Sequence, residues 1–154
     1  MTAAIEAKLA ELGLTLPEAA APVAAYVSTV EAGGMLFISG QLPFRDGQVM
    51  DGRLGEDRDL AYGQEAAQRC GLMLVAQMQK ALGDLGRVER IVKLGAFVSS
   101  TADFTDQPQV VNGASELMLA LFGEAGRHAR SAVGVPVLPR GAAVEIDAIV
   151  AIRA

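Results

Sequence analysis

The sequence predicts an α+β domain of two layers, a mixed β-sheet with two long helices on one of its faces. Segments 60–85 and 107–122 place apolar residues at helical spacing along one side. Segments 91–99 and 142–152 instead alternate apolar with other residues at a period of two, as half-buried strands do. The 154 residues suit one core, because a chain of this length buries roughly two-thirds of the surface that it exposes when unfolded.

A short amphipathic helix is expected within residues 1–16, as an extension ahead of a main domain at 17–154. Its apolar positions follow helical spacing, and they are Ile5, Leu9 and Leu12. Thr2 is the candidate N-cap, and Pro17 lies just beyond the segment, where it stops a helix from continuing.

Two strands are expected next, at 23–30 and 34–39, because both segments are rich in valine, aromatic and β-branched residues. The turn between them is Glu31–Gly34. It is not a phosphate-binding loop, since neither a helix nor a Gly-x-Gly-x-x-Gly motif follows it. Segment 43–59 contains three glycines and no periodic pattern, so it is predicted as a surface loop with room for a short strand.

The first long helix, 60–85, is expected to rest an apolar stripe on the sheet. The stripe consists of Ala67, Gly71, Leu74, Met78, Leu82 and Leu85. Cys70 lies near it, where a free cysteine behaves as a small buried hydrophobic residue. The central strand that follows, 91–99, then sorts into two faces, Val92, Leu94, Ala96 and Val98 on one and Lys93, Gly95 and Phe97 on the other.

A second helix is expected at 107–122, where Gly123 and Gly126 follow as stop signals. Its apolar face consists of Val111, Ala114, Met118 and Leu121. A strand at 129–135 comes next. Arg130 shares one face of that strand with Ala132 and Gly134, which are small enough to leave room beside a guanidinium group.

The last strand, 142–152, has an apolar residue at every even position, so this face should pack on the helices. Glu145 and Asp147 then lie on the opposite face, which one helix layer leaves uncovered. That far face also carries Phe97, Val133 and Val135. A half-apolar uncovered face is typical of self-association.

Composition excludes several classes of protein. The net charge of −5 disfavours nonspecific nucleic-acid binding, which depends on neutralising phosphates. One cysteine and one histidine are too few for a disulfide framework or a typical zinc site, and they argue against a Ser-His nucleophile. Apolar runs reach about six residues, whereas a membrane-spanning helix needs roughly 20. No secretory signal pattern is visible, so a cytoplasmic protein without a membrane partner is expected.

Arginine's planar fork suits bidentate recognition of a carboxylate, and a charge-assisted hydrogen bond contributes about 1.5–3 kcal/mol in a partly desolvated cleft. Arg130 therefore predicts a small carboxylic acid as the ligand.

The motifs around Arg130 resemble the C-terminal signature of the YjgF/RidA family. They read His128-Ala129-Arg130-Ser131 and then Leu138-Pro139-Arg140-Gly141-Ala142-Ala143-Val144-Glu145-Ile146-Asp147-Ala148-Ile149. Upstream segments fall in the family's order, namely Tyr26-Val27, Met35-Leu36-Phe37-Ile38-Ser39-Gly40-Gln41-Leu42-Pro43, Val92-Lys93, Phe97-Val98 and Val111-Asn112. The resemblance covers about residues 20 to 153.

This resemblance implies a chorismate-mutase-like protomer that assembles as a homotrimer with three clefts between subunits. It implies that Arg130 binds the substrate carboxylate and that Glu145 holds and activates water. The remaining substrate-binding positions that it implies are Tyr26, Ser39 and Asn112 as pocket residues and Gly40 and Phe97 along the cleft. The implied reaction is hydrolysis of enamine or imine acids, such as 2-aminoacrylate, to a 2-oxo acid and ammonia, with no cofactor or metal.

The chain departs from the family pattern near Arg130. His128 stands where proline is common, and Ala132 stands where many members have cysteine. The N-terminal extension and an insertion of about four residues between Phe104 and Val111 are further differences. Together they indicate a divergent subgroup with a reshaped pocket mouth.

Two other functions fit the same residues. One is a noncatalytic protein that binds small 2-oxo or amino acids through Arg130. The other is an endoribonuclease, against which the net charge and the single histidine argue. Among individual residues, Arg130 and Lys93 could serve intersubunit ion pairs, Glu145 could be a solvated acid, and Tyr26 could be packing. His128 is expected to be an inert loop histidine, although its ordinary pKa lies near neutrality.

Overall fold

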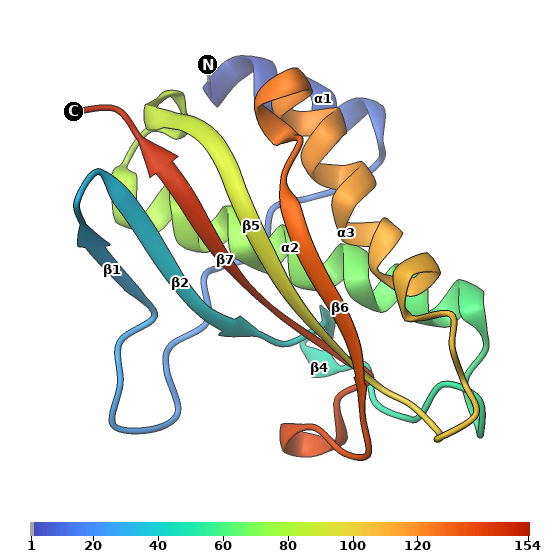
Figure 1. The fold of residues 1–154 in the computed structure, drawn as a ribbon. Coiled ribbons are helices and arrows are strands. Elements are labelled where there is room, and N and C mark those ends of the chain that lie inside the picture. The colour runs from blue at the N-terminus through green and yellow to red at the C-terminus, as the bar shows by residue number, and fades with distance from the viewer. Residues whose placement is uncertain (1) are drawn as a thin grey trace.

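Five strands form one mixed sheet in the order β1-β2-β7-β5-β6 in the computed structural model, which describes residues 2–154 (Figure 1). Only β5 and β6 pair in parallel; the other neighbours are antiparallel. A separate two-stranded hairpin, β3-β4, lies in the loop after β2. The strands are β1 Thr29–Ala32, β2 Met35–Gln41, β3 Phe44–Arg45, β4 Gln48–Val49, β5 Val88–Ser99, β6 Ala129–Val135 and β7 Val144–Ile152.

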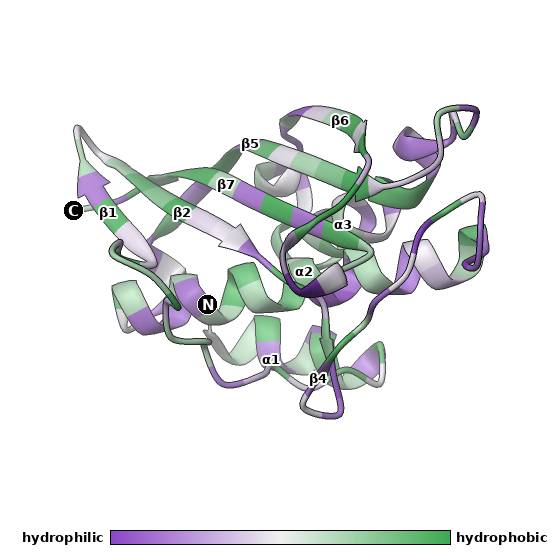
Figure 2. Ribbon diagram, turned by 90° about the horizontal axis from the view of Figure 1, so that it is seen from below, coloured by the Kyte–Doolittle hydropathy of each residue, from purple (hydrophilic) through white to green (hydrophobic). Residues whose placement is uncertain are grey.

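The helices lie on one side of this sheet and leave its other side uncovered (Figure 2). Their bounds are α1 Thr2–Glu11, α2 Leu60–Leu82 and α3 Gln107–Phe122, with short 3-10 turns η1 Leu85–Arg87, η2 Gly123–Gly126 and η3 Pro139–Gly141. The prediction of an α+β fold with a mixed sheet is confirmed. Among residues 2–154, no helix combines the length and apolar character that crossing a membrane requires.

The core lies between the sheet and the α2–α3 layer. The predicted apolar face of α3 is buried, as are the even positions of β7, Val144, Ile146, Ala148 and Val150. Cys70 is fully buried there, and its burial raises the pKa of the thiol well above the usual value. Ile5 and Leu9 of α1 join this core, whereas Leu12 lies beyond the end of that helix and is 45% exposed. The side chain of Thr2, predicted as the N-cap, lies outside the described part.

Two sequence predictions about strands are wrong. The first strand begins at Thr29, because residues 23–28 form an irregular loop. In β5 the pairing with β7 shifts register between Ile91 and Lys93. Ile91 is therefore buried against the helices and Val92 leaves the buried face that it was expected to share with Leu94.

Other element ends differ by a few residues. The helix predicted to end at Leu85 ends at Leu82, because Gly83 adopts φ 77° and donates its N–H to the Gln79 carbonyl. The last strand begins at Val144 rather than at 142. The predicted bounds of α3 and β6 match the observed ones.

Close packing of α2 against α3 depends on Gly113. A Cβ atom at this position would overlap the backbone carbonyl oxygen of Gln64 on α2. We expect Gly113→Ala to lower the free energy of unfolding by about 2 kcal/mol, because rigid backbone must move apart. Urea unfolding measures this change.

Gly71→Ala is the matched control for this prediction. Its Cβ would lie 3.0 Å from the end of the Leu117 side chain, which can rotate away. Equal stability of the Gly113→Ala variant and the wild type would contradict the packing argument.

Candidate functional site

The residues predicted for the site fall into two groups on opposite faces of the sheet. Arg130 points from β6 toward α3, on the helix side. Glu145 lies on the uncovered face of β7, beside Gly40 of β2. Strand β5 separates β6 from β7. One chain therefore does not bring Arg130 and Glu145 together.

Three acceptors on α3 hold the guanidinium of Arg130. Its Nη1 donates to Asn112 Oδ1 at 3.0 Å and to Ser115 Oγ at 3.1 Å, and its Nη2 donates to the Pro108 carbonyl at 3.1 Å. A guanidinium has five N–H groups. Within residues 2–154, one N–H on Nε and one on Nη2 thus have no acceptor, and they can bind a carboxylate.

The helix α3 supplies these acceptors from one side. Asn112 and Ser115 are three residues apart, so they lie next to each other on the helix surface. Asn112 was predicted from the family motif, whereas Ser115 was not singled out. Its i, i+3 relation to Asn112 is the signal that could have found it.

The space beside Gly134 is not free, contrary to the sequence argument. A Cβ at Gly134 would lie 2.7 Å from Gln107 Nε2 and from Ser100 Oγ. Gln107 also donates to the Phe104 carbonyl at 2.8 Å, which fixes its amide there. The small residue at 134 therefore accommodates Gln107 rather than a ligand.

His128, expected to be inert, is hydrogen-bonded on both ring nitrogens. Its Nε2 lies 2.8 Å from Ser115 Oγ, and its Nδ1 lies 2.7 Å from the Gly126 carbonyl oxygen. Burial lowers the pKa of the imidazole, and the charge on Arg130 lowers it further, against the raising effect of the bond to Gly126. His128 is thus part of the Arg130 cluster.

The second group borders a pocket of about 310 Å³ at the end of β2. Glu145 and Arg140 are its charged lining residues. The rest of the lining is mainly apolar and consists of Ala20, Ala21, Pro22, Val23, Ala24, Tyr26, Ser28, Gly40, Gln41, Leu42, Phe44 and Pro139. Such a surface, mainly apolar with few charges, is typical of a small-molecule site.

Glu145 is half-buried, and burial raises the pKa of its carboxyl; the neighbouring Asp147 adds to the rise. A Cβ at Gly40 would lie 2.9 Å from Glu145 Oε2, so glycine at this position leaves room for the carboxylate. Burial also raises the pKa of Asp147, partly offset by the Gly95 backbone and by Lys93. A carboxyl with a raised pKa is suited to proton transfer near neutral pH.

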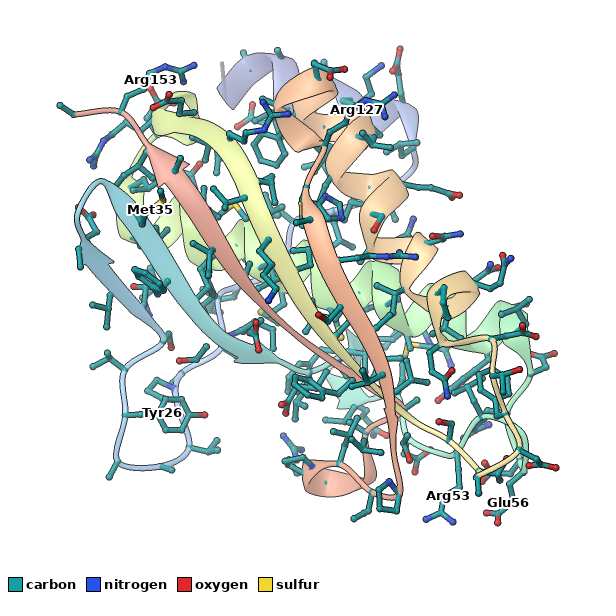
Figure 3. The ribbon with its side chains drawn as sticks, in the orientation of Figure 1. Tyr26, Met35, Arg53, Glu56, Arg127 and Arg153 are labelled. Carbon is teal, nitrogen blue, oxygen red and sulfur yellow. The ribbon has the colours of Figure 1, made fainter. Side chains whose placement is uncertain are left out.

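The other predicted residues have different positions. Tyr26 lines the pocket on the loop before β1 and is 47% exposed. Figure 3 shows it on the loop at the β1 edge of the sheet, whereas Arg127, which precedes β6, lies at the other edge. Ser39 does not line the pocket; its Oγ donates to the Val27 carbonyl at 2.8 Å and so holds the Tyr26 loop. Phe97 pairs across the strands with Glu145 on the uncovered face.

The buried side-chain amides of Gln77 and Gln41 fix the start of the loop that carries Tyr26. Gln77 of α2 donates to the Ala20 carbonyl at 2.8 Å and lies 3.2 Å from Gln41 Oε1. The Gln41 amide in turn donates to the Ser39 carbonyl at 2.9 Å. These bonds tie the pocket wall to both layers of the fold. No sequence pattern predicts these bonds, because they join residues far apart in the chain.

Arg140 is a pocket residue that the sequence analysis named only as part of the C-terminal motif. It adopts φ 59°, in the left-handed region, within η3. Its guanidinium carbon lies 5.6 Å from the centre of the Phe44 ring. This stacking places a cation in the pocket lining, which also contains the Glu145 carboxylate.

Known proteins are similar to this chain in sequence and in fold. The profile of the family described as "YjgF/chorismate_mutase-like, putative endoribonuclease" matches residues 6–149. Protein TCP17 of Trypanosoma cruzi is 56% identical over 148 residues, which are 95% of this chain and 92% of the relative. A 2-iminobutanoate/2-iminopropanoate deaminase of Dermatophagoides farinae is 27% identical and covers 91% of this chain and 95% of its own.

Among solved structures, the protein Atu1372 of Agrobacterium tumefaciens, whose function is unknown, superposes with a TM-score of 0.94 at 47% identity. The match covers 99% of this chain and 94% of that one. The family profile spans most of the chain, and the fold matches over nearly its whole length. The chain therefore belongs to the YjgF/chorismate mutase-like family, which includes the YjgF/RidA proteins that its motifs resemble.

Proposed function

We propose that this protein hydrolyses small enamine or imine carboxylic acids to 2-oxo acids and ammonia, in clefts between neighbouring subunits. The observation that carries the proposal is the Arg130 guanidinium, held by three acceptors on α3 with two N–H groups free for a carboxylate. Membership of a family that includes a 2-iminobutanoate/2-iminopropanoate deaminase supports the reaction class.

The need for a second subunit follows from the separation of the two groups. Arg130 lies on the edge strand β6 and faces the helices, whereas Glu145 lies on the uncovered face. That face exposes large apolar side chains, Phe37 at 43% and Val133 at 46%. A closed ring of three chains would cover such a face and set the Arg130 side of one chain against the Glu145 pocket of the next.

The chemistry in such a cleft requires positioning and one proton carrier. Arg130 binds the substrate carboxylate and fixes the imine carbon. Glu145 accepts a proton from water while the water oxygen bonds to that carbon. That proton passes to the substrate nitrogen and gives a carbinolamine. The hydroxyl proton of the carbinolamine then moves through Glu145 to the nitrogen, the C–N bond breaks, and ammonia leaves as the carbonyl forms. An enamine substrate first takes a proton on its terminal carbon to become the imine.

An assay with imines generated in place tests this proposal. A dehydratase acting on threonine or serine releases 2-iminobutanoate or 2-aminoacrylate, and formation of the 2-oxo acid is followed with and without the protein. We expect acceleration that scales with protein concentration. No acceleration, with 2-oxobutanoate still binding, would contradict hydrolysis and favour a noncatalytic carboxylate-binding protein.

A further inference from the structure

Ser115 and His128 lie beside Arg130, and the carboxylate role of Arg130 does not account for their arrangement. The Gly126 carbonyl can only accept a hydrogen bond, so His128 Nδ1 carries a hydrogen. In the neutral ring Nε2 is then an acceptor. The hydroxyl of Ser115, 2.8 Å away, donates its hydrogen to Nε2.

We propose that Ser115 and His128 are positioning residues that orient the Arg130 guanidinium and couple carboxylate binding to uptake of one proton by His128. This inference rests on the proposed function only in taking Arg130 as the group that binds the carboxylate.

The neutral pair fixes which part of Ser115 faces the arginine. Because the hydroxyl hydrogen is directed to His128, the oxygen lone pairs are left to accept from Arg130 Nη1 at 3.1 Å. Asn112 and Pro108 complete the set of acceptors. Both Nη1 hydrogens are then engaged, and the free N–H groups on Nε and Nη2 are held in one orientation.

Protonation of His128 changes this arrangement. Nε2 becomes a donor, so its hydrogen and that of Arg130 Nη1 converge on the single oxygen of Ser115. Two cations then share one acceptor, which is unfavourable in a half-buried site. The lowered pKa of His128 agrees with this picture, since burial and the charge on Arg130 both act in that direction.

A carboxylate bound to Arg130 brings a negative charge to the same cluster. It offsets the repulsion between the two cations, so the pKa of His128 rises in the complex. By reciprocity of linkage, the carboxylate binds more tightly to the protein with protonated His128.

The other charged groups around the ring are already paired or satisfied. Glu124 in η2 pairs with Arg127 at 3.0 Å. Arg90 of β5 donates to the carbonyls of Glu124 and Arg127. The residue of helix α3 that contacts the His128 imidazole is the uncharged Ser115. The charge on Arg130 of β6 is therefore the one whose neutralisation by a carboxylate should change the pKa of His128.

His128 is the only histidine in the chain, so its ring signals in a proton NMR spectrum need no assignment. We would titrate them in the wild-type protein with and without saturating 2-oxobutanoate, which is not turned over. The expected result is a pKa below the ordinary histidine value in the free protein and a higher one in the complex. The affinity for 2-oxobutanoate should then rise about fivefold or more as the pH falls from above the His128 pKa of the complex to below that of the free protein.

His128→Gln provides the matched variant, because its side chain keeps an acceptor for Ser115 and cannot titrate in this range. This variant should bind 2-oxobutanoate with an affinity that does not depend on pH between the two His128 pKa values of the wild type. Binding that leaves the His128 pKa unchanged, or a pH dependence that persists in His128→Gln, would overturn the inference and leave the proposed deaminase intact. Absence of 2-oxobutanoate binding at every pH would overturn it together with the role of Arg130.

Discussion

Replacement of Arg130 by alanine is expected to weaken binding of 2-oxobutanoate by at least about 100-fold, because two charge-assisted hydrogen bonds are lost and each contributes about 1.5–3 kcal/mol. Isothermal titration calorimetry measures this change directly. Arg130→Lys should recover only part of the affinity, since an ammonium group cannot form the planar bidentate pair. The imine hydrolysis should disappear with the binding.

Arg127→Ala is the control for this prediction. It removes a guanidinium three residues away, whose side chain is exposed and pairs with Glu124. Loss of that charge should leave 2-oxobutanoate affinity nearly unchanged. Equal affinity of Arg130→Ala and the wild type would remove the carboxylate-binding role, and equal weakening by both substitutions would reduce it to a general charge effect.

Replacement of Glu145 by glutamine is expected to lower kcat by about 100- to 10,000-fold, the usual contribution of a general acid or base, and to leave 2-oxobutanoate binding largely intact. The wild-type rate should fall on the acid side as the carboxylate becomes protonated. Because burial and Asp147 raise the pKa of Glu145, this fall should be centred above the ordinary carboxyl value. A pH–rate profile with generated 2-iminobutanoate checks both points.

Asp147→Asn makes the same chemical change two residues along the same face of β7. Removing this like charge should lower the pKa of Glu145 and move the acid limb of the profile to lower pH, with a small change in kcat. A Glu145→Gln variant that keeps the wild-type rate would show that Glu145 is a structural residue of the uncovered face.

Most of the fold follows from local pattern. The bounds of α3 agree with prediction because apolar spacing, Gly123 and the helix-breaking residues around it act within a few positions. The even positions 144–150 of β7 are buried as expected for the same reason. The register shift in β5 could not be predicted. One extra residue moves Val92 to the other face of the strand, and the alternation of apolar and polar residues in the sequence does not indicate this.

The site depends on tertiary contacts that the pattern does not contain. Residues 23–28 have strand-forming side chains, yet hydrogen bonds from Ser39 to the Val27 carbonyl and from Gln77 to the Ala20 carbonyl hold this part of the backbone as a loop. The contact between His128 and Ser115 arises because the crossover from β5 through α3 returns to β6, which brings a helix surface over the strand end. Motif resemblance located Arg130 and Glu145, and strand alternation implied opposite faces for them, but only the structure shows the acceptors on α3 that hold Arg130.

Activity of mixed assemblies tests the central claim that each site is shared between chains. Arg130→Ala and Glu145→Gln chains, carrying different tags, would be co-expressed and the assemblies containing both purified and compared with each variant alone. Every trimer that contains both chains has one of its three clefts with both native groups, so the purified mixed assemblies are expected to show about a third of the wild-type activity although each variant alone is inactive. Mixed assemblies as inactive as either variant alone would contradict a shared site.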